Sequence, residues 1–81
     1  MEAEIAVARA YEVAENPAMS ELSKIDKLLW IDAQIYQNIG TDTSKNYKEK
    51  SKRASAVIYR LIKTIDHEKG QRFLNALGLS K

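Results

Sequence analysis

Few residues in this chain have the chemistry needed for catalysis or for holding a metal ion. Its 81 residues include no cysteine, which excludes a disulfide framework, a thiolate zinc site and a cysteine nucleophile. The only histidine, His67, lies between Asp66 and Glu68. Consecutive helical side chains point about 100° apart and do not converge on one small ion. We interpret this triplet as solvated charge at a helix junction, and we expect no metal ion and no cofactor.

The segment Gly40-Thr41-Asp42-Thr43-Ser44-Lys45 has a composition that superficially suggests a phosphate-binding loop. It lacks the second glycine and the preceding strand that a P-loop requires, so we interpret it as a turn rich in helix-capping residues. No segment has the pattern of a nucleophile elbow. The chain is therefore predicted not to be an enzyme.

Two residues break the amphipathic pattern of a predicted helix over Ser20–Ile39. Asp32 projects among apolar side chains such as Leu28 and Ile35, where a carboxylate without a partner is costly. It either pairs with a tyrosine hydroxyl, lysine or arginine of the next helix or supplies a polar contact to a partner. Trp30 projects among polar residues. It is either covered by another helix or is an interface residue, because tryptophan dominates binding hot spots.

A basic face is predicted on the following helix. Its members are Lys45, Lys48, Lys52, Tyr59, Arg60 and Lys63. Cations along one face could follow a phosphate backbone while the Tyr59 ring stacks on a base. The same face could instead contact an acidic protein surface or be an ordinary solvated helix surface. No helix-turn-helix is predicted, because the helices on either side of Gly40 are too long and too antiparallel.

Helical periodicity and capping residues predict the elements that hold these side chains, and no window of six residues alternates as a half-buried strand should. The predicted helices cover Glu2–Glu15, Ser20–Ile39, Ser44–Ile65 and a short segment after Asp66 that carries Phe73, Leu74 and Leu77. Gly78 is expected to end the last helix, with Leu79 packing back on Leu74. Gly70 weakens the first turn of that helix, because glycine costs about 1 kcal/mol relative to alanine in a helix interior.

These elements predict an all-α fold in a single domain over residues 1–81. We expect a small bundle of three to four helices built on a long antiparallel hairpin of Ser20–Ile39 and Ser44–Ile65. The apolar arc of Ser20–Ile39 covers nearly half the helix circumference, and an arc of that width contacts two neighbours. Because so short a chain has a limited core of its own, we also expect it to form a homo-oligomer.

Charge is distributed unevenly along the chain. The net charge of +2 combines −5 over residues 1–44 with +7 over residues 45–81. This asymmetry favours a nucleic-acid or acidic-protein partner, unless acidic and basic helices simply pack side by side. The longest apolar runs are four residues, so no membrane span is predicted. The start Met1-Glu2-Ala3-Glu4 is acidic where a signal peptide would be basic, so we expect a cytoplasmic location.

Two functions remain open from the sequence. The first is a small, non-catalytic protein-binding or regulatory module that acts by occupying the surface of a protein partner, as a homo-oligomer. Asp32, Trp30 and the absence of catalytic groups favour it. The alternative is nucleic-acid or nucleotide-phosphate binding through the basic face, which the local excess of lysine and arginine favours.

Overall fold

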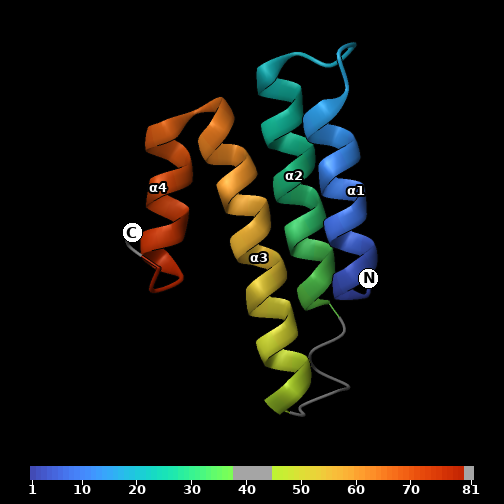
Figure 1. The fold of residues 1–81 in the computed structure, drawn as a ribbon, viewed down its shortest axis with the longest axis vertical. Helices are drawn as coiled ribbons and strands as arrows, with labels where there is room; N and C mark the ends of the chain where they lie inside the picture. Colours follow the sequence, from blue (N-terminus) through green and yellow to red (C-terminus); the bar gives the residue numbers. More distant parts are fainter. Residues whose placement is uncertain (38–44, 80–81) are drawn as a thin grey trace.

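The chain folds into α-helices. The computed structural model describes residues 1–37 and 45–79, and these residues form four helices and no strand (Figure 1). The helices are α1 (Ala3–Glu15), α2 (Glu21–Tyr36), α3 (Lys45–Ile65) and α4 (His67–Ala76). The prediction of an all-α bundle is confirmed. The predicted helix ends at Ile39 and Ser44 lie outside the described residues.

The helix ends follow from local capping chemistry. Ser20 caps α2, with its Oγ accepting a hydrogen bond from the Ser23 amide at 3.2 Å, and Asp66 caps α4 in the same way. At the end of α4, Gly78 takes a left-handed φ of 87° and the Leu79 amide donates to the Leu74 carbonyl at 2.8 Å. This arrangement is the Schellman stop expected from the sequence.

Helices that follow one another along the chain run in opposite directions. Figure 1 shows α2 descending beside α3, which ascends, so the predicted antiparallel hairpin is present. Helices α1, α2 and α3 each contact the other two, whereas α4 contacts α3. The result is a flat molecule of 36 × 26 × 14 Å in which α4 lies at one side (Figure 1).

The hydrophobic core lies between α1, α2 and α3. Helix α2 contributes Ile25, Leu28, Ile31 and Ile35, and the other two helices add Ala6, Ala10, Ala54, Ile58 and Ile62. The alanines let α1 approach closely. As the wide apolar arc predicted, α2 packs against both of its neighbours.

Helix α4 packs on α3 through Gly70. This glycine is buried, and a Cβ atom placed on it would lie 2.4 Å from both Cα and the backbone nitrogen of Lys63. The two backbones therefore approach each other more closely than any larger residue at position 70 would allow. The helix continues through Gly70, whose amide donates to the Asp66 carbonyl at 3.0 Å. The close approach explains why glycine stands at a position where it weakens the helix.

Candidate functional site

The basic face predicted on α3 is divided by α4. The backbone of Lys63 lies against Gly70, and the ring of Tyr59 stacks on Phe73 of α4, with ring centroids 5.1 Å apart. The members that remain exposed are Lys45, Lys48, Lys52 and Arg60. The structure therefore does not bring all six residues together on one open surface, because a second helix covers part of it.

Asp32 has hydrogen-bond partners inside the chain. Its Oδ1 accepts from the Ser55 hydroxyl at 2.5 Å, and its Oδ2 accepts from the Tyr59 hydroxyl at 2.7 Å. The Tyr36 hydroxyl lies 2.6 Å from Ser55 Oγ. Because Ser55 gives its only proton to Asp32, Tyr36 must donate to Ser55. Of the two sequence interpretations, pairing with a tyrosine hydroxyl of the next helix is the one observed.

Tyr59 belongs to this internal network. Burial, followed by the hydrogen bond to Asp32 and the charge of that carboxylate, raises the pKa of the Tyr59 phenol above its ordinary value. Its hydroxyl is engaged by Asp32 and its ring by Phe73. Stacking of this ring on a nucleic-acid base stays a prediction from the sequence.

Trp30 lies at the surface of α2, and 49% of it is exposed. The Lys27 ammonium lies 4.2 Å from the centroid of the indole ring. On the α1 side of Trp30 is a hollow that also involves Ile5 and Arg9. The rest of the protein leaves about half of Trp30 exposed, and its interpretation as an interface residue stays a prediction.

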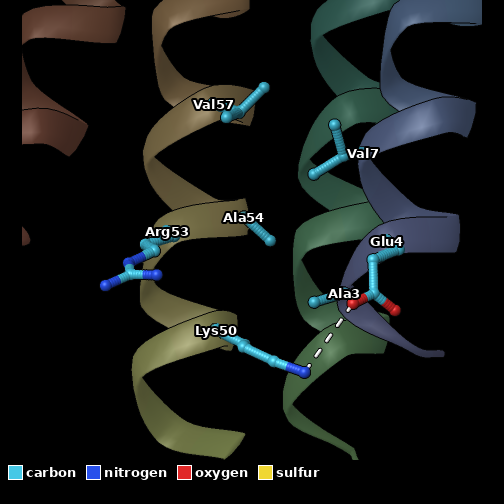
Figure 2. Close-up of a pocket in the computed structure, with 7 residues that line it drawn as sticks. All are labelled: Ala3, Glu4, Val7, Lys50, Arg53, Ala54 and Val57. Atoms are coloured by element: carbon cyan, nitrogen blue, oxygen red, sulfur yellow. Dashed lines mark ion pairs between the residues drawn. The ribbon is translucent and has the colours of Figure 1, made fainter. Parts of the chain in front are cut away.

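A groove along α3 was not predicted from the sequence. It consists of two hollows. The first, of 310 Å³, lies between α1 and α3 (Figure 2), and the second, of 380 Å³, lies between α3 and the segment that follows α4. Arg53 and Val57 line both hollows, so the two form one continuous surface, which we call the α3 groove. Its lining residues are Ala3, Glu4, Val7, Glu49, Lys50, Lys52, Arg53, Ala54, Ala56, Val57, Arg60 and Leu79.

The α3 groove combines an apolar floor with cationic edges. Figure 2 shows Val7 and Val57 on facing helices, with Lys50 reaching from α3 toward Glu4 of α1. The ammonium of Lys50 lies 3.8 Å from the Glu4 carboxylate, and both side chains are largely exposed. The groove contains four cations and two acids: Lys50, Lys52, Arg53 and Arg60 against Glu4 and Glu49. An exposed ion pair of this kind holds its partners weakly, so Lys50 stays available to an incoming acid.

One sequence signal could have revealed the groove. Lys50, Arg53, Val57 and Arg60 follow one another at spacings of three, four and three residues. Residues at these spacings share one strip of a helix. The strip mixes an apolar residue with cations, and it differs from the predicted basic face, of which it includes only Arg60.

Among the described residues, no group of three histidine, cysteine, aspartate or glutamate side chains is placed to hold a metal ion. None of the helices formed by these residues has the length and apolar character needed to cross a membrane. Comparison with known proteins finds no matching family model, curated protein or solved structure.

Proposed function

We propose that the protein is a small, non-catalytic protein-binding module that regulates a partner by occupying its surface, and that the α3 groove receives an acidic amphipathic helix of that partner. The observation that carries this proposal is the combination of an apolar floor, whose partly exposed members are Val7 and Val57, with cations along its edges at Lys50, Arg53 and Arg60. The module needs no cofactor for this role. A cytoplasmic location stays a prediction from the sequence.

The dimensions of the groove suit a short helix. From Lys50 to Arg60 the α3 strip is about 15 Å long, at a rise of ~1.5 Å per residue, which corresponds to about three turns of a bound helix. The apolar face of such a helix would contact Val7 and Val57, while its carboxylates would pair with the surrounding cations. Binding of an amphipathic helix by an apolar groove is a recurring mode of recognition, and charge complementarity sets its specificity.

Nucleic acid fits the same surface less well. Phosphate contacts use cations and leave an apolar floor without a role, whereas an amphipathic helix uses both. The tyrosine expected to stack on a base is held by Asp32 and Phe73. We therefore favour an acidic protein partner and treat nucleic-acid binding as an outcome of the experiment.

The test uses a designed helical peptide with leucines on one face and glutamates on the other, and fluorescence anisotropy as the measurement. A scrambled peptide of the same composition and charge, without an amphipathic pattern, is the ligand control. We expect the full chain to bind the amphipathic peptide more tightly than the scrambled one. If both peptides bind equally, the groove recognises charge alone and the proposal is wrong.

Matched charge reversals locate the binding surface. Arg53 and Arg60 lie in the groove, whereas Lys45 and Lys48 are exposed cations outside it. Arg53→Glu with Arg60→Glu should raise the Kd for the peptide by about tenfold or more, whereas Lys45→Glu with Lys48→Glu should have a much smaller effect. Equal losses in the two double variants would contradict a specific groove. Tighter binding of a single-stranded oligonucleotide than of the peptide, with a steep salt dependence, would favour the alternative function.

A further inference from the structure

We infer that the surface around Trp30 is a self-association interface whose partner is a second copy of this chain. This Trp30 face consists of Ile5, Arg9 and Glu12 of α1 together with Asp26, Lys27 and Trp30 of α2. The inference does not rest on the proposed function, because the α3 groove uses a different side of α1, through Ala3, Glu4 and Val7.

The shape of the Trp30 face is suited to a copy of itself. Trp30 borders two hollows, one of 530 Å³ on the side of Ile5 and one of 380 Å³ on the side of Met19. Ile5 is 47% exposed and Trp30 is 49% exposed. A projecting indole beside hollows on the same surface lets each copy insert its tryptophan into the other. A two-fold axis requires a self-complementary surface of this kind, because the same patch must serve as both partners.

The charges around Trp30 are also complementary to themselves. Arg9 and Lys27 are balanced by Glu12 and Asp26, so the face carries no net charge. Within the part of the chain that the structure describes, none of these four side chains forms an ion pair. In a two-fold dimer, each contact between a cation of one copy and an acid of the other occurs twice by symmetry. By contrast, the α3 groove has an excess of cations and would repel a copy of itself.

The direct measurement is the mass of the full chain by sedimentation equilibrium, from low to high micromolar concentration. We expect a reversible dimer, and we expect Trp30→Ala to raise its dissociation constant by about tenfold or more. Tyr11→Ala is the matched control, because Tyr11 is an aromatic residue of α1 with 46% exposure that lies outside the Trp30 face. The inference fails if the unaltered chain is a monomer at every concentration, or if Trp30→Ala and Tyr11→Ala have equal effects.

A mixing experiment separates an interface from a defect in folding. Arg9→Glu with Lys27→Glu makes the face wholly acidic, and Glu12→Lys with Asp26→Lys makes it wholly basic. Each variant alone should be a monomer through like-charge repulsion, and an equimolar mixture of the two should dimerise. Loss of fold cannot be rescued by mixing. A mixture that stays monomeric would overturn the inference.

Discussion

Replacing Gly70 by alanine tests the packing of α4 on α3, because helix propensity and packing predict opposite signs. Alanine is favoured over glycine in a helix interior by about 1 kcal/mol, so propensity alone predicts a more stable protein. The structure predicts a less stable one. The new Cβ would lie 2.4 Å from backbone atoms of Lys63, which have no rotamer by which to move away.

The size of the effect follows from that distance. Carbon atoms in ordinary contact are about 3.5 Å apart. The added Cβ would lie 2.4 Å from Lys63, so α4 must move away from α3 by roughly 1 Å around position 70. Overpacking of this kind typically costs about 1–3 kcal/mol, and a backbone neighbour places the cost at the upper end. After the propensity gain is subtracted, we expect a net loss of about 2 kcal/mol. For a domain of this size such a loss lowers Tm by roughly 10 °C.

Thermal and urea unfolding followed by circular dichroism provide the assay. The control is Arg72→Gly, compared with Arg72→Ala, at an exposed position inside the same helix where propensity acts without packing. Arg72→Gly should lose no more than about 1 kcal/mol relative to Arg72→Ala. A Gly70→Ala protein that is more stable than the unaltered chain would refute the close approach of α4 to α3.

Other substitutions test the interior polar groups. Ser51→Ala should leave stability unchanged or raise it by up to about 1 kcal/mol, because the buried Ser51 hydroxyl has no hydrogen-bond partner among the described residues. Ser55→Ala should lower the free energy of unfolding by about 1–3 kcal/mol in urea, because it leaves Asp32 and Tyr36 short of a partner. The raised pKa of Tyr59 favours the protonated phenol in the folded state. The protonated phenol therefore stabilises the fold fully below the ordinary pKa of about 10, and this stabilisation is lost as pH rises beyond that value. The free energy of unfolding, measured in urea at increasing alkaline pH, should therefore change less with pH for Tyr59→Phe than for the unaltered chain.

Local patterns in the sequence were sufficient for the helices and their ends. Ser20, Asp66 and Gly78 act at the positions their types predict, because capping depends on neighbouring residues alone. The need of Asp32 for a partner was also predictable, since its position on the helix demanded one. The sequence, however, predicts Tyr59 as a member of the basic face, whereas in the structure its hydroxyl donates to Asp32.

Helical periodicity does not predict how α4 packs on α3. Periodicity shows which side of a helix is apolar, but α4 covers a side of α3 that is rich in cations. The sequence feature that indicates this packing is a pair of small residues. Ala56 is small on the cationic side of α3, and Gly70 is small on α4. Small residues allow close approach without an apolar stripe. The second hollow of the α3 groove depends on this packing, because Leu79 follows α4, and it was missed for the same reason.

The order in which the helices contact one another has a consequence for folding kinetics. Of the contacting pairs among the described helices, α1 with α2, α2 with α3 and α3 with α4 are neighbours along the chain, and α1 with α3 is not. Contacts between chain neighbours close short loops, and helical proteins in which such local contacts dominate fold in about microseconds to milliseconds. The first hollow of the α3 groove lies between α1 and α3, which are not consecutive in the chain. Its two walls therefore come together only when the longer segment that contains α2 has been closed into a loop.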